Sequence, residues 1–140
     1  MTPYLIVDNG AKAIEFYQQV FGAKVVMCME MPNKKVGHAE LTIGDSKFML
    51  ADTCTEMNAQ GPKAFGGSPV GIHLYVKDVD AVADIAVKHG AKLVRKVENQ
   101  FYGDRSGCLE DPFGHSWYIA THVEDVSEAE MEKRMKEMSK

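Results

Sequence analysis

The side chains best suited to small-molecule chemistry in this sequence are aromatic rings and one histidine on segments of strand character. Tyr4 opens YLIV, His73 and Tyr75 alternate in GIHLY, and Tyr118 lies in SWYIATH. Side chains two residues apart on a strand point to the same face. The predicted inward-facing set of an aromatic cup is Tyr4, Ile6, Phe48, Leu50, His73, Tyr75 and Tyr118. Aromatic walls with a few polar groups are typical of small-ligand pockets, although each of these residues also suits an ordinary core position.

One charged pair, Asp104-Arg105 in the segment QFYGDRSG, offers a further binding group. A guanidinium at the mouth of a pocket binds a carboxylate or phosphate through two parallel N–H bonds. The alternative is a local Asp104–Arg105 ion pair that holds the loop. Both interpretations stay open at this point, and Arg105 is a candidate ligand-binding residue.

Composition and motifs exclude several classes of function. The sequence contains no nucleophile elbow, P-loop, dinucleotide fingerprint or zinc-ligand spacing. Sixteen basic and 20 acidic residues give a net charge of −4, which argues against nucleic-acid or anionic-membrane partners. No apolar run approaches the roughly 18 residues of a membrane span. The three cysteines are far apart and form no CxxC pair, which predicts a cytoplasmic protein.

An internal repeat predicts the elements that position these residues. YLIVDNGAKAIEFYQQVFGAKVV (4–26) matches HLYVKDVDAVADIAVKHGAKLV (73–94), so that FGAKVV corresponds to HGAKLV. Each copy has a strand, an N-cap residue (Asn9 or Asp78), an amphipathic helix, a terminating glycine (Gly22 or Gly90) and a second strand.

The repeat continues into two more strands in each copy. GHAELTIGDSKFMLAD (37–52) predicts a hairpin that turns at Gly44-Asp45. Its counterpart SGCLEDPFGHSWYIATH (106–122) turns at the segment 111–114, which suits a type I turn. Matching the glycines of these turns aligns Phe48 with Tyr118. The predicted architecture is therefore α+β, with two βαβββ repeats that form one eight-stranded curved sheet.

The predicted organisation is one domain with four parts: a first module over 1–52, a linker or flap over 53–69, a second module over 70–122, and a C-terminal helix over 123–140. Ser127 and Glu130 have capping-box spacing at the start of this helix. Met131, Met135 and Met138 form a narrow apolar stripe on it. Either the parent domain or a second subunit is expected to cover the stripe.

The paired repeat resembles the vicinal oxygen chelate superfamily, which includes glyoxalase I, bleomycin- and fosfomycin-resistance proteins and extradiol dioxygenases. The segments AIEFYQQVFGA, GHAELTIGDSKFMLAD, QFYGDRSG and EDPFGHSWYIATHVEDVS carry the resemblance, which extends from residue 3 to about 128 and is closer to the PhnB-like branch. It implies a glyoxalase-like fold. It does not identify a function, because the superfamily contains enzymes and binding proteins.

The resemblance also locates four metal-ligand positions. They fall on Thr2 and Gly71 in the first pair and on Phe48 and Tyr118 in the second, and none of these offers an imidazole or carboxylate. The superfamily metal site is therefore expected to be missing, and no cofactor is predicted. The alternative is a displaced metal held by His73 together with His38 or Glu40.

These observations predict a small-molecule-binding protein of glyoxalase/bleomycin-resistance type that works without the superfamily metal. The alternative is a glyoxalase-like lyase or isomerase, or a related enzyme, that uses a displaced metal or acid–base groups such as His73 and Tyr118. A third alternative is an accessory dimer with a vestigial cup. The ligand stays unnamed. A closed homodimer is expected, because open sheet edges and the methionine stripe need cover.

Overall fold

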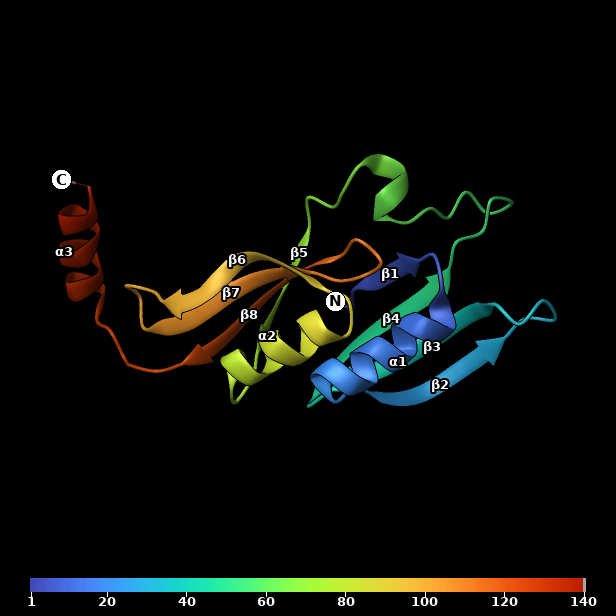
Figure 1. Ribbon diagram of the computed structural model, residues 1–140, viewed down its shortest axis with the longest axis horizontal. Coiled ribbons are helices and arrows are strands. Elements are labelled where there is room, and N and C mark those ends of the chain that lie inside the picture. The colour runs from blue at the N-terminus through green and yellow to red at the C-terminus, as the bar shows by residue number, and fades with distance from the viewer. Residues whose placement is uncertain (140) are drawn as a thin grey trace.

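The computed structural model describes residues 1–139, which form two modules of the same design followed by a helix (Figure 1). The first module consists of β1 (Tyr4–Val7), α1 (Gly10–Phe21), β2 (Lys24–Glu30), β3 (Val36–Ile43) and β4 (Ser46–Asp52). The second consists of β5 (Gly71–Tyr75), α2 (Val79–Lys88), β6 (Lys92–Asn99), β7 (Asp104–Glu110) and β8 (Ser116–His122). The short 3-10 helix η1 (Pro62–Phe65) lies between the modules, and α3 (Glu128–Met138) follows the second. None of the helices in residues 1–139 is long and apolar enough to cross a membrane.

Each module forms a mixed four-stranded sheet, with strand orders β1-β4-β3-β2 and β5-β8-β7-β6. The first strand of each module runs parallel to the last, and the other neighbouring strands are antiparallel. The predicted α+β fold of two βαβββ repeats is confirmed. The eight strands are divided between two sheets, however, and no strand within residues 1–139 pairs across the two modules.

The capping residues act as the sequence predicts. Asn9 Oδ1 accepts a hydrogen bond from the backbone N–H of Lys12 at the start of α1, and Asp78 Oδ1 accepts one from Ala81 at the start of α2. Gly22 has a φ of 68° directly after α1, and Gly90 has a φ of 99° after α2. These left-handed conformations end both helices and direct the chain into β2 and β6.

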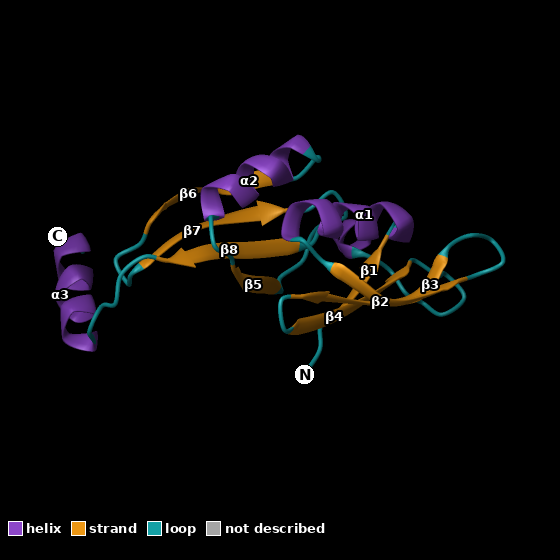
Figure 2. Cartoon of the chain, turned by 90° about the horizontal axis from the view of Figure 1, so that it is seen from below, coloured by secondary structure: helices purple, strands orange, loops and turns teal. Residues whose placement is uncertain are grey.

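Both helices cover the same side of the two sheets, and the opposite side carries no helix (Figure 2). Buried residues such as Leu5, Leu50 and Ile119 belong to the core shared with the helices. Their neighbours along the strands point to the uncovered side, because strand side chains alternate between faces. We call the two uncovered surfaces the open face of the first module and the open face of the second module.

A buried carboxylate joins the two modules. Asp111, in the β7–β8 loop, accepts hydrogen bonds from the hydroxyl of Tyr17 on α1 (2.5 Å) and the indole N–H of Trp117 on β8 (2.9 Å). It also accepts from the backbone N–H groups of Phe113 and His115. Trp117 packs on Tyr17 and Phe21 of α1, so one loop of the second module anchors the helix of the first.

The β4 strand is displaced by one residue from the register that the repeat predicts. Tyr4 pairs with Met49, and His73 pairs with Tyr118, so Met49 rather than Phe48 is the structural counterpart of Tyr118. The turns differ in length. The pair Ile43–Ser46 encloses two residues, whereas residues 111–115 separate Glu110 from its partner Ser116. Matching the turn glycines therefore moves β4 out of step, and a one-residue shift reverses the face of every side chain.

The C-terminal helix stands at one end of the molecule (Figure 1). Ser127 Oγ accepts from the backbone N–H of Glu130, so this half of the predicted capping box is present. Arg134 attaches the helix to the second module by donating to the carbonyl of Phe101 (2.9 Å) and to Glu124 (2.8 Å). No residue of α3 is buried. The described chain covers the methionine stripe only in part: Met131 is half-buried, whereas Met135 and Met138 are exposed.

Candidate functional site

The open face of the first module carries a hydrogen-bonded chain of polar side chains. Tyr4 and Met49 share this face, as do His38 and Glu40, which occupy alternate positions of β3. The hydroxyl of Tyr4 lies 2.7 Å from Nδ1 of His38, and Nε2 of the same ring lies 3.1 Å from a carboxylate oxygen of Glu40. The second oxygen of Glu40 accepts from the ammonium of Lys47 at 2.8 Å.

The partners of His38 define its proton arrangement. A carboxylate accepts and does not donate, so Nε2 of His38 carries the proton toward Glu40. In the neutral ring, Nδ1 then accepts from the hydroxyl of Tyr4. Burial and the charge of Glu40 raise the pKa of Tyr4, which keeps the phenol protonated at neutral pH. Hydrogen bonds from Lys47 and His38 lower the pKa of Glu40, which keeps it ionised.

A cavity of about 640 Å³ lies beside this chain of hydrogen bonds. Tyr4, Ile6 and Ala51 line it from the open face of the first module. Its remaining walls come from the β2–β3 hairpin (31–37), from Asp52 at the end of β4 and from the connection that follows (53–59). The volume falls within the roughly 300–1,000 Å³ typical of small-molecule pockets.

The open face of the second module carries a second polar array. Its predicted members His73, Tyr75 and Tyr118 lie together there, with the rings of His73 and Tyr75 4.8 Å apart. The hydroxyl of Tyr75 donates to Asp104 at 2.7 Å. The other oxygen of Asp104 lies 3.0 Å from Nδ1 of His122.

Hydrogen bonds within this second array shift the pKa values of its side chains. Burial raises the pKa of Asp104, but hydrogen bonds from His122 and Tyr75 outweigh it, so the net shift is downward. The hydrogen bond to Asp104, followed by burial, raises the pKa of Tyr75. His122 also contacts Asp125 through Nε2 at 2.7 Å. Both ring nitrogens therefore face carboxylates, and the hydrogen bonds to Asp104 and Asp125 raise the pKa of His122.

Two predicted site residues, Phe48 and Leu50, do not lie on an open face. They pair with Leu41 and Ala39 on the helix side of the first sheet and belong to the buried core. The ring of Phe48 packs edge-on against Tyr17 of α1, with the ring centroids 5.4 Å apart. The prediction that they share a face with Tyr4 is wrong, and the shifted register of β4 is the reason.

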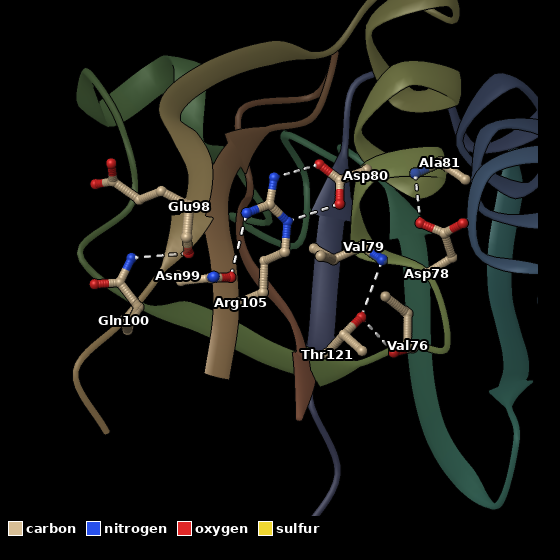
Figure 3. Close-up of polar contacts among 10 residues, drawn as sticks. All are labelled: Val76, Asp78, Val79, Asp80, Ala81, Glu98, Asn99, Gln100, Arg105 and Thr121. Carbon is tan, nitrogen blue, oxygen red and sulfur yellow. Dashed lines mark hydrogen bonds and ion pairs between the residues drawn. The ribbon is translucent and has the colours of Figure 1, made fainter. Parts of the chain in front are cut away.

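Arg105 also lies away from the predicted cup. Its guanidinium donates two hydrogen bonds to Asp80 of α2, at 2.8 and 2.9 Å, and one to Asn99 (Figure 3). The bidentate pair holds α2 on β7, on the helix side of the sheet. The local Asp104–Arg105 pair is not formed, and Arg105 lies on the helix side of β7, away from the open face that carries His73.

Only weak patterns in the sequence indicated where the remaining polar residues lie. His38 and Glu40 alternate in GHAEL, a pattern that predicts a shared strand face. Their contact with Tyr4 depends on β3 and β1 both pairing with β4, which spacing alone does not reveal. Asp104 and His122 are 18 residues apart in the sequence and meet because β7 and β8 pair along their full length.

The structure tests whether the superfamily metal fits this chain. With the corrected register, the expected ligand positions are Thr2, Met49, Gly71 and Tyr118. None provides an imidazole or carboxylate, and a Cβ atom at Gly71 would overlap the ring of Tyr118, which fills that place. The four positions do not fit a divalent metal. Within residues 1–139, no three His, Cys, Asp or Glu side chains are grouped to hold a metal ion.

Two curated relatives are themselves uncharacterized. The chain is 39% identical over 138 residues to an uncharacterized protein of Mycobacterium tuberculosis (strain ATCC 25618 / H37Rv), covering 96% of this chain and 81% of that protein. It is 31% identical over 117 residues to the uncharacterized protein At5g48480 of Arabidopsis thaliana, covering 77% and 69% of the two chains.

Solved structures share the fold. The X-ray structure of the At5g48480 gene product has a TM-score of 0.69 at 28% identity and covers 86% of this chain and 96% of that one. A PhnB protein from Bacillus cereus has a TM-score of 0.68 at 18% identity, with 86% and 98% coverage, a likeness of fold alone. Finally, the family model described as the Glyoxalase/Bleomycin resistance protein/Dioxygenase superfamily matches residues 2–119. The chain belongs to this superfamily.

Proposed function

We propose that this protein binds a small molecule at the open face of the first module, without the superfamily metal. The cavity of about 640 Å³ beside Tyr4 is the observation that carries the proposal. It is large enough for a drug-sized ligand, and polar groups that could orient a ligand stand at its edge.

The lining indicates the kind of ligand. Ile6, Met31 and Met57 offer apolar surface, and thioether side chains adapt to irregular shapes. Tyr4 donates its one O–H to His38, which leaves its hydroxyl oxygen free to accept a hydrogen bond from a ligand. A largely apolar molecule with one hydrogen-bonding group therefore fits the site best.

A second candidate is a metal-free enzyme that uses acid–base chemistry. The observation in its favour is the chain Tyr4–His38–Glu40, in which a phenol, an imidazole and a carboxylate are hydrogen-bonded in sequence. Such a chain can move a proton to or from a ligand bound beside Tyr4. Turnover, rather than binding, separates this candidate from the first.

A reducing cytoplasm is the proposed location. Cys28 is exposed, Cys54 is half-buried and Cys108 is buried, and all three are free thiols. Free thiols persist in compartments that keep cysteines reduced.

The test is a thermal-shift screen of small molecules, followed by calorimetric titration of each hit. A ligand that binds the native state raises the melting temperature. Ala51→Phe, which directs a ring into the cavity, should weaken binding by about tenfold or more, and Tyr4→Phe by about fivefold, the worth of one neutral hydrogen bond. Tyr102→Phe changes a tyrosine outside the cavity lining and should leave the affinity unchanged.

Two outcomes decide between the candidates. If hits bind Ala51→Phe as tightly as the wild type, the cavity is not the site and the proposal fails. If a hit is converted to product, as followed by one-dimensional NMR, and His38→Gln still binds it without converting it, the enzyme candidate replaces simple binding.

A further inference from the structure

The open face of the second module carries a row of side chains that no part of the proposed function uses. Arg95 on β6 pairs with Cys108 on β7, Cys108 pairs with Tyr118 on β8, and Tyr118 pairs with His73 on β5. Directly paired residues of neighbouring strands project from the same face. The row therefore crosses the whole sheet, with a guanidinium at one end and an imidazole at the other.

A β-bulge places Arg95 on this face. Leu93 pairs with Leu109, which is fully buried on the helix side, and Arg95 pairs with Cys108 instead of Gly107 after the irregularity between them. In a regular strand, Arg95 would share the face of Leu93. The extra residue turns its side chain to the open face, and bulges commonly re-aim a side chain in this way.

Arg95 differs from the other two arginines of the chain. Arg105 pairs with Asp80, and Arg134 pairs with Glu124 and Glu130. Within residues 1–139, Arg95 forms no ion pair, and its side-chain hydrogen bond reaches Ser106 Oγ at 3.5 Å, the long limit of such a bond. Most of its five N–H donors are therefore available to a ligand.

Glu98 shares this face through its pairing with Ser106, but no carboxylate within residues 1–139 forms an ion pair with Arg95. Burial raises the pKa of the Cys108 thiol, and the opposing effect of Arg95 is smaller, so the thiol stays neutral. The carboxylate of Asp104 is already engaged by Tyr75 and His122. The exposed rings of Tyr118 and His73 complete the row.

We propose that this row is a binding site for a small planar organic anion, in which Arg95 takes a carboxylate or phosphate and Tyr118 supports the apolar body. A guanidinium binds the paired oxygens of either anion in the same planar geometry. The hydroxyls of Ser106 and Tyr118 and the imidazole of His73 supply further polar contacts along the row. The site lies on the second module and does not depend on the cavity in the first.

The experiment is a two-dimensional NMR titration of the full chain with three probes: 2-naphthoate, 2-naphthyl phosphate and the neutral 2-naphthylmethanol. Both anions should shift the amide signals of Arg95, Ser106 and Tyr118. Comparing the titration with 2-naphthoate to that with 2-naphthyl phosphate shows whether the site prefers a carboxylate or a phosphate. The neutral probe should bind at least about tenfold more weakly, since it loses a charge-assisted contact.

Variants assign the effect to the guanidinium. Arg95→Gln should weaken the binding of both anions by about tenfold or more. Arg95→Lys keeps the positive charge but loses the paired N–H donors of the guanidinium, and it should weaken binding less. Lys88→Gln removes one positive charge from α2 and serves as the matched control, with an expected change below about twofold. Unchanged affinity in Arg95→Gln, equal binding of the neutral probe, or shifts confined to other residues would each overturn the proposal.

Discussion

At the scale of single residues, Asp111 joins the two modules through a buried set of hydrogen bonds. Its carboxylate accepts from two side chains and two backbone N–H groups, and it is buried. Burial, together with the charge of Asp111, raises the pKa of Tyr17 well above its usual range, so the phenol stays protonated and donates to Asp111. The contact joins α1 of the first module to a loop of the second.

Removing this carboxylate should destabilise the whole chain. Asp111→Ala leaves buried donors on Tyr17 and Trp117 without an acceptor, and we expect it to lower the free energy of unfolding by at least about 3 kcal/mol. Tyr17→Phe removes one donor to a charged group and should cost about 1–3 kcal/mol. Urea unfolding measures both changes, with Tyr102→Phe as the control. A loss below about 1 kcal/mol in Asp111→Ala would refute this role.

His122 should make stability depend on pH. Its ring lies between Asp104 and Asp125, and its pKa in the folded protein is raised. Protonated His122 therefore stabilises the fold. This stabilisation is complete below the pKa of histidine in the unfolded chain, about 6.5, and is lost as the pH rises through the higher pKa of His122 in the folded protein. Asp104 acts in the opposite sense, since its lowered pKa stabilises the fold above about pH 4.

The difference in the free energy of unfolding between the wild type and His122→Gln should therefore be largest near pH 5.5 to 6. In this range Asp104 is ionised and His122 is protonated. The difference should shrink toward pH 9. Chemical unfolding at a series of pH values measures it. His89→Gln, whose side chain forms no hydrogen bond within residues 1–139, is the control and should show no such trend. A difference that grows as the pH rises would contradict the assignment of His122.

At the scale of elements, local signals predicted the fold well. Helix caps at Asn9 and Asp78, the glycines after each helix and the alternation of strand residues all act locally. The sequence therefore predicts both βαβββ modules. The division into two sheets was not predicted, because strand pairing across modules depends on how the modules pack.

The candidate site was less predictable, because it depends on register. Tyr4, His73, Tyr75 and Tyr118 were assigned to the correct faces, since the first strands of the two repeats match without a gap. Phe48 and its neighbours in β4 follow turns of unequal length, so their faces were reversed. A bulge in β6 likewise turned Arg95 outward, and no composition signal marks that irregularity.

At the scale of the whole molecule, the described chain leaves much apolar surface uncovered. Every residue of β2 is exposed, including Val26 and Met29, which are 57% and 54% exposed. On α3, Met135 and Met138 are 53% and 68% exposed. These two elements lie toward opposite ends of the molecule (Figure 1), and an exposed apolar patch on a protein often marks an interaction site. A second copy of the chain is our proposed partner, because two-fold homodimers are the commonest soluble oligomers.

This proposal predicts a homodimer that buries at least about 800 Å² on each partner. Met135→Lys combined with Met138→Lys should weaken it, because both side chains are exposed in the single chain and the charges would be desolvated at an interface. Glu132→Gln with Glu137→Gln makes the same change in net charge on that helix without removing apolar area and is the matched control. Sedimentation at a series of concentrations measures the dimer. A wild type that stays monomeric at high concentration would refute the dimer, whereas a double methionine variant that dimerises like the wild type would place the interface away from α3.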